Sequence, residues 1–89
     1  MAKPSNTIVI VEWEDPATYT SWMSKNKAHQ KKPGHVVSVG IWLGEHSGNL
    51  ILALDEMDYG DRYHGVASIP LRCIISIQYV KMPVKEIME

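Results

Sequence analysis

The sequence contains no phenylalanine, a single cysteine and no long apolar run, and these absences exclude several classes of protein. Cys73 is the single cysteine and forms no internal disulfide, which excludes a secreted disulfide scaffold. No segment approaches the roughly 20 apolar residues of a membrane-spanning helix, and residues 1–6 lack the apolar stretch of a signal peptide. We therefore expect a soluble protein of a reducing compartment, without a membrane partner.

Neither sign of charge is in excess, but the two signs are segregated along the chain. Nine Lys and Arg against ten Asp and Glu give a formal net charge of −1, so the basic surplus that duplex nucleic-acid binding requires is missing. Residues 25–35 contain four Lys and no acid, whereas residues 45–61 contain five acids and no Lys or Arg. The near-neutral total therefore hides one basic and one acidic segment.

The length predicts one domain over residues 1–89, with residues 1–6 and 82–89 as candidate flexible tails. A hydrophobic content of 45% is typical of a folded chain. A domain of this size has a small core, and apolar side chains such as Met57 and Met82 fall outside the strand pattern. Because association would bury them, we expect a homo-oligomer, most simply a tetramer.

Five short segments have the β-branched or alternating apolar pattern of strands. They are residues 7–13, 35–43, 50–54, 64–69 and 74–80. Asp15 as a cap and Pro16 at the first helical position predict a helix of about ten residues after the first segment. Residues 55–63 are expected to form a polar loop, and residues 70–73 a single tight turn.

This order of elements predicts a mainly β fold with one short helix. Five strands, with a single turn between the fourth and the fifth, favour a small five-stranded SH3-like or Sm-like barrel. The alternative is a strongly bent antiparallel sheet with the helix across its mouth.

No residue pattern indicates catalysis or a bound cofactor. Cys73 directly precedes an isoleucine-rich strand, which is typical of a small buried residue rather than a nucleophile. The four histidines match no metal-ligand spacing, and the glycine motifs that cradle phosphates are absent. We therefore expect a protein that is not an enzyme and holds neither metal nor cofactor.

The aromatic and cationic residues instead indicate a recognition surface for a small anionic ligand. Trp13, Tyr19 and Trp22 gather where the first strand meets the expected helix, and Trp42 alternates with small residues on the polar face of its strand. Flat rings stack on nucleobases and cations pair with phosphates, although a chain without phenylalanine also needs these rings for its core. The candidate ligand-binding residues are Trp13, Tyr19, Trp22, Lys25, Lys27, Ser38, Trp42 and Arg62.

Four short motifs carry a resemblance to a known family. They are Val11-Glu12-Trp13-Glu14-Asp15, Ser38-Val39-Gly40, Leu52-Ala53-Leu54, and Ile69-Pro70 before the terminal isoleucine strand. Their order and spacing over residues 9–79 resemble a widespread family of small phage-encoded proteins, some of which are anti-CBASS sponges of type four. The resemblance implies a homotetramer that sequesters cyclic dinucleotide alarm signals in the cytoplasm of the infected bacterial host. It assigns no ligand residue in this chain.

Two functions from different classes follow. The first is phage immune evasion, in which the protein binds and sequesters a cyclic dinucleotide without catalysis and so blocks host signalling. The alternative is an SH3-like protein-interaction module that binds an extended peptide through an aromatic groove around Trp42. An Sm-like RNA-binding role is disfavoured by the acidic segment and the neutral total charge.

Overall fold

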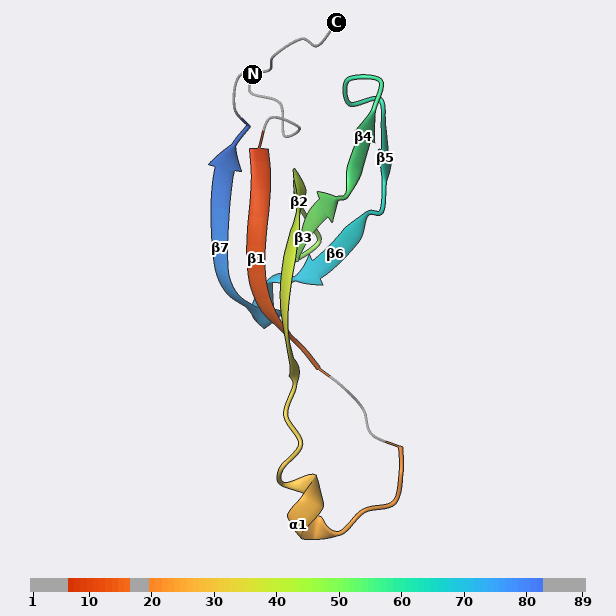
Figure 1. Ribbon diagram of the computed structural model, residues 1–89, viewed down its shortest axis with the longest axis vertical. Coiled ribbons are helices and arrows are strands. Elements are labelled where there is room, and N and C mark those ends of the chain that lie inside the picture. The colour runs from red at the N-terminus through yellow and green to blue at the C-terminus, as the bar shows by residue number, and fades with distance from the viewer. Residues whose placement is uncertain (1–6, 17–19, 83–89) are drawn as a thin grey trace, which may run out of the picture.

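The computed structural model describes residues 7–16 and 20–82 (Figure 1), and they form a mainly β structure, as the sequence predicts. The elements in chain order are β1 (Thr7–Asp15), α1 (Lys25–Ala28), β2 (Gly34–His46), β3 (Asn49–Ala53), β4 (Asp55–Met57), β5 (Arg62–His64), β6 (Ala67–Pro70), η2 (Leu71–Cys73) and β7 (Ile74–Lys81). Five strands form an antiparallel sheet in the order β6-β3-β2-β1-β7, and β4 pairs with β5.

The single turn predicted before the last strand is confirmed as the 3₁₀ helix η2. It carries the chain from one edge strand of the sheet, β6, to the opposite edge strand, β7. The backbone N–H of Leu71 donates to the carbonyl of Gly48 over 3.0 Å, which ties this connection to the β2–β3 turn. Within the described ranges no ladder joins β6 to β7, so the sheet stays open and the closed barrel is not seen.

Two β-bulges help to bend the sheet around its core. In the first, Ile75 of β7 is the extra residue opposite the Glu12–Trp13 step of β1. In the second, Leu43 of β2 is the extra residue, between Trp42 and Gly44. Gly44 has a φ of 99°, a backbone conformation that glycine adopts more easily than any residue with a side chain. A bulge increases the local twist and bends its strand, so the sheet curves and has an inner and an outer face.

The core lies on the inner face of this sheet. Five buried side chains pack together there and are here called the core cluster: Val9, Val11, Leu50, Leu52 and Ile69. Trp13, Trp42, Ile74 and Ile77 are half-buried and pack against it. Side chains alternate across a strand, and the register pairs Val9 with Gly40 and Val11 with Ser38. The face of β2 that we expected to be polar is therefore the inner face, and that expectation is wrong.

The prediction of a ten-residue helix from Pro16 is also wrong. Asp15 is the last residue of β1, where it pairs with Gly34 instead of capping a helix. Residues 20–24 are irregular, and α1 has four residues with the Ser24 hydroxyl accepting from the Lys27 N–H over 3.2 Å. A helix this short gains little without a buried apolar face, and none of its residues is buried.

Residues 20–32, here called the arm, project from the sheet instead of crossing it (Figure 1). Every described residue of the arm is exposed except Met23, which is half-buried. The arm gives the molecule principal extents of 61 × 30 × 21 Å. The helix therefore does not lie across a barrel mouth, which corrects that part of the alternative fold.

Residues 55–64 form a second projection, here called the distal hairpin, in place of the expected polar loop. Asp58 and Tyr59 have φ values of 51° and 54°, and Gly60 has 97°, so the turn between β4 and β5 uses left-handed backbone that the spacing of apolar residues does not reveal. His64 belongs to this hairpin, and β6 begins only at Ala67. The distal hairpin and α1 lie at opposite ends of the molecule (Figure 1).

Candidate functional site

A hollow lies where the arm leaves the sheet, and we call it the root hollow. Its volume is about 310 Å³, and it is lined by Glu14, Pro16, Pro33, Arg72, Cys73, Ile74 and Ile75. The antiparallel pairing of β1 with both β2 and β7 brings these residues together. Four of them are proline or isoleucine, so two charged groups, Glu14 and Arg72, stand against mainly apolar walls.

A polar cluster on the outer face lies close to the root hollow. His35 Nε2 lies 2.8 Å from Glu12 Oε2, and the Ser76 hydroxyl donates to Glu12 Oε1 over 3.0 Å. These two hydrogen bonds, that of His35 first, hold the pKa of the Glu12 carboxyl below its usual value. The carboxylate stands between the serine and the histidine, so no imidazole is placed to take the serine proton, as a Ser-His-acid triad requires.

Three of the predicted ligand residues belong to the inner face of the sheet. Trp13 Nε1 donates to the Ser38 hydroxyl over 3.0 Å, and this pair is partly buried. Trp42 meets Tyr79 edge to face, with ring centroids 5.5 Å apart. Trp42 Nε1 is buried and has no hydrogen-bond partner within residues 7–16 and 20–82. Trp13 and Trp42 therefore pack as core aromatics.

The space expected beside Trp42 is already filled. A Cβ on Gly40 would lie 2.6 Å from the Ala53 carbonyl oxygen and 2.7 Å from Leu52 Cδ1. Gly40 lets β2 and β3 approach closely, and it leaves no room for a ligand ring at that point.

Three further candidates lie on the arm. Trp22, Lys25 and Lys27 are all exposed, and in the part of the chain that the structure describes none of their side chains has an ion pair or a hydrogen-bond partner. Lys25 and Lys27 belong to α1, which lies at the opposite end of the molecule from the distal hairpin (Figure 1). Tyr19 lies outside the described residues.

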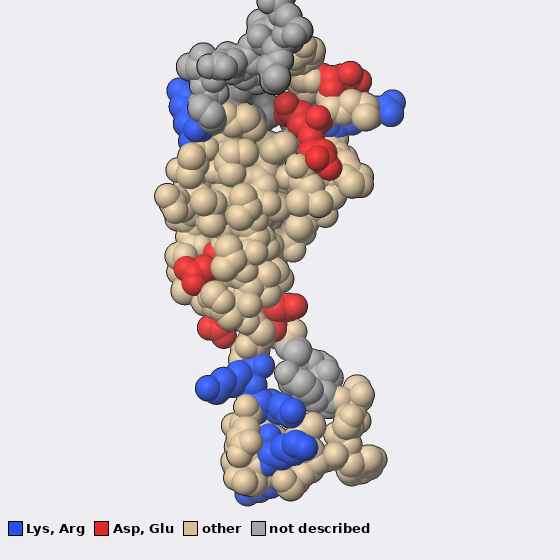
Figure 2. Space-filling view, in the orientation of Figure 1, with Lys and Arg blue, Asp and Glu red and all other residues tan. Residues whose placement is uncertain are grey.

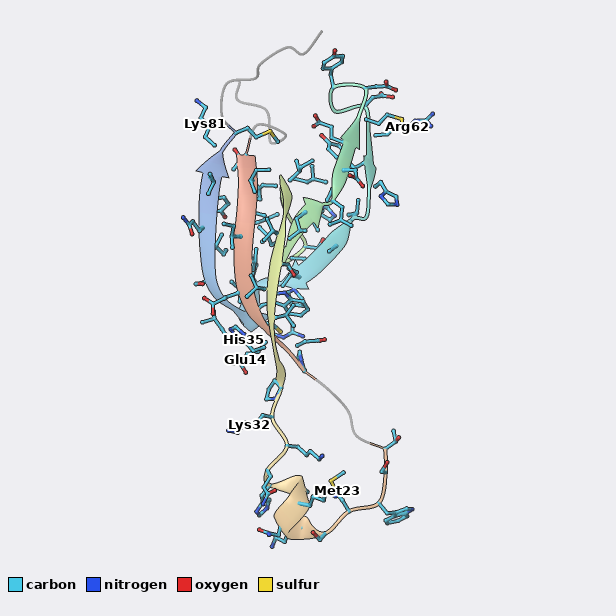
Figure 3. The ribbon with its side chains drawn as sticks, in the orientation of Figure 1. Glu14, Met23, Lys32, His35, Arg62 and Lys81 are labelled. Carbon is cyan, nitrogen blue, oxygen red and sulfur yellow. The ribbon has the colours of Figure 1, made fainter. Side chains whose placement is uncertain are left out.

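Arg62 belongs to the distal hairpin, at the other end of the molecule from Met23 in the arm (Figure 3). Its Nε lies 4.0 Å from Asp61 Oδ2, and both side chains are largely exposed. His64 Nδ1 lies 2.9 Å from Asp55 Oδ2 across the hairpin. A single chain therefore divides the predicted residues among the inner face, the arm and the distal hairpin, and does not assemble them into one site.

Glu14 and Arg72, the two charged residues of the root hollow, are not among the ligand residues predicted from the sequence. Glu14 and Arg72 are far apart in the sequence, and the β1–β7 pairing together with η2 places both at the root hollow. The one sequence feature that could have indicated Arg72 was its position next to Cys73, in the turn before the last strand.

Comparison of the chain with protein-family models, with curated proteins and with solved structures found no match. Among residues 7–16 and 20–82, no group of three or more His, Cys, Asp or Glu side chains is placed to hold a metal ion. Within the same residues no helix has the length and apolar character needed to cross a membrane.

Proposed function

We propose that the protein binds a cyclic dinucleotide without changing it chemically, and that it acts by sequestering this signal. The observation that carries the proposal is the root hollow, with apolar walls around one cation and one carboxylate. Ligand sites are commonly mainly apolar, with a few polar groups that fix orientation. In the family that the sequence resembles, such ligands are host alarm signals, so the proposed place of action is the cytoplasm of an infected bacterial host.

The chemistry of the root hollow suits one nucleotide unit. Pro16, Pro33 and Ile74 offer apolar walls to a base, and the Glu14 carboxylate is an acceptor for exocyclic amino groups. The Arg72 guanidinium is the group for the phosphate, because it pairs with phosphate oxygens in a bidentate manner. A volume of about 310 Å³ is near the lower end of ligand pockets, roughly 300–1,000 Å³, so half of a two-fold ligand fills it.

The arrangement of nucleophilic groups supports binding over catalysis. Ser76 faces a carboxylate instead of an imidazole. Cys73 lines the root hollow, but among the described residues no hydrogen bond joins its thiol to a histidine. We therefore propose that bound ligand is released intact.

The finer fold that we propose is an opened form of the small SH3-like barrel. The sheet order β7-β1-β2-β3-β6 and the one-turn connection η2 support it, since only pairing between β6 and β7 is missing for closure. Peptide capture through an aromatic groove receives less support, because the Trp42 ring packs against the core cluster.

The test is a calorimetric titration of the wild-type protein and the Arg72→Ala variant with a panel of cyclic dinucleotides. A charged hydrogen bond contributes about 1.5–3 kcal/mol, so Arg72→Ala should weaken binding roughly tenfold to a hundredfold. Lys81→Ala is the matched control, since it also removes one positive charge but lies at the far end of β7 (Figure 3). Ligand recovered after denaturation and chromatography should be intact.

Absence of binding to the wild-type protein by every member of the panel would refute the function. Binding that Arg72→Ala leaves unchanged would refute the site. Linear product in the chromatogram would show that the protein is an enzyme.

A further inference from the structure

The tip of the arm is a surface without a covering partner in the single chain. Trp22 is fully exposed, and Lys25 and Lys27 follow it at the start of α1. No side chain of these three has an ion pair or hydrogen bond elsewhere in the described residues. An indole held away from every apolar contact, beside two cations, is suited to a surface that is both apolar and acidic.

The distal hairpin has this complementary character. It surrounds a hollow of about 230 Å³, here called the hairpin hollow, lined by Asp55, Glu56, Met57, Arg62, Tyr63 and His64. The Met57 side chain is exposed, and three further carboxylates besides that of Asp55 lie on residues 56, 58 and 61. Glu56 Oε1 is buried and lacks a hydrogen-bond donor among the described residues. The distal hairpin therefore combines an exposed apolar side chain with four carboxylates against the single cation Arg62.

These two surfaces cannot meet within one chain. They lie at opposite ends of a molecule whose longest extent is 61 Å, and the lysines of the arm and the acids of the distal hairpin are visible at those ends in Figure 2. The partner that fits the arm is therefore a second copy of this chain, which presents the same acidic hairpin.

We propose that two copies associate antiparallel, with the arm tip of each seated on the distal hairpin of the other. Trp22 occupies the hairpin hollow and packs against the exposed Met57 side chain. Lys25 and Lys27 face the carboxylates around the hollow. The two contacts are identical under a two-fold axis, so the association closes on itself and does not extend into a filament. This interface is separate from the root hollow and goes beyond the proposed function.

Paired charge reversal tests the proposal on the full chain. The first variant carries Lys25→Glu and Lys27→Glu, and the second carries Glu56→Lys and Asp61→Lys. In either variant alone both contacts join like charges, whereas in a mixed pair both contacts join opposite charges. Light scattering at micromolar concentration should give the wild type an even multiple of the 10.1 kDa chain mass. Each variant alone should show half that mass or less, and an equimolar mixture should recover the wild-type mass.

Two controls keep the result interpretable. Lys81→Glu reverses a charge outside both surfaces and should keep the wild-type mass. Trp22→Ala removes a side chain that is fully exposed in the single chain, so it should leave the circular dichroism spectrum unchanged while weakening association at least tenfold.

A monomeric wild type overturns the proposal. So do charge-reversed variants that keep the wild-type mass, or folded variants whose mixture fails to associate. The titration with cyclic dinucleotides tests the proposed function in a separate experiment. Failure of the proposed association is therefore distinguishable from failure of the proposed function.

Discussion

The close approach of β2 and β3 predicts a large effect from a single methyl group at Gly40. In Gly40→Ala the new Cβ would lie 2.6 Å from the Ala53 carbonyl oxygen and 2.7 Å from Leu52 Cδ1. Overpacking of this kind costs about 1–3 kcal/mol. One of the two close atoms belongs to the backbone of the paired strand and cannot move without disturbing the ladder. We therefore expect the upper part of that range, about 2–3 kcal/mol.

For a domain of this size, each 1 kcal/mol lowers the melting temperature by about 4–8 °C, so Gly40→Ala should melt roughly 8–24 °C below the wild type. Urea unfolding followed by circular dichroism should show a lower midpoint with an unchanged slope. Gly34→Ala is the matched control, because its Cβ would meet only the Asp15 carbonyl oxygen at 4.0 Å. That change should be neutral or stabilise by up to about 1 kcal/mol. Equal midpoints for the two variants would refute the close approach of β2 and β3, and would restore the space for a ligand ring beside Trp42.

Two further predictions concern hydrogen bonds at the sheet. Ser38→Ala leaves the partly buried Trp13 Nε1 without its acceptor and should destabilise by about 1–2 kcal/mol in urea unfolding, whereas Ser68→Ala, on an exposed part of β6, should have no effect. The folded-state pKa of Glu12 is lowered, chiefly by His35, so its carboxylate contributes stability that is complete above the unfolded pKa and is lost as the pH falls through the folded pKa. The difference in unfolding free energy between wild type and Glu12→Gln should therefore be largest near neutral pH and should shrink below about pH 4.5; a difference independent of pH would contradict this assignment.

The strands of the large sheet were predictable because their signal is local. Alternation from residue 35 to residue 43 and the β-branched run from residue 7 require only neighbouring residues. Ser47 and Gly48, both with positive φ, form the two-residue turn between β2 and β3 where the sequence offered a hairpin loop. The short turn before the last strand was likewise readable from its length.

The face assignment of β2 and the two projections were not predictable in this way. Which side of an alternating strand is buried depends on its partner strands, and here the valines at 37 and 39 are exposed while Ser38 and Gly40 cover the core. The helical spacing of Tyr19, Trp22 and Met23 resembled an amphipathic helix, but the arm has no surface against which to bury such a face. The positions of the described candidate ligand residues depend on the same two projections, because Trp22, Lys25 and Lys27 lie on the arm and Arg62 lies on the distal hairpin.

The exposed arm links the assembly to the stability of the fold. Fixing the backbone of one residue costs roughly 1–2 kcal/mol of conformational entropy. Side chains that stay in water bury no apolar surface and therefore offset little of this cost. In the single chain every described arm residue except Met23 is exposed, so the arm has almost no burial to offset the cost of its conformation. Seating Trp22 on a partner would supply apolar burial at the point where the chain is farthest from its own core. The same step would anchor Pro33, which lies between the arm and β2 and lines the root hollow. Association and ligand binding would then reinforce each other through the arm, although they use different residues.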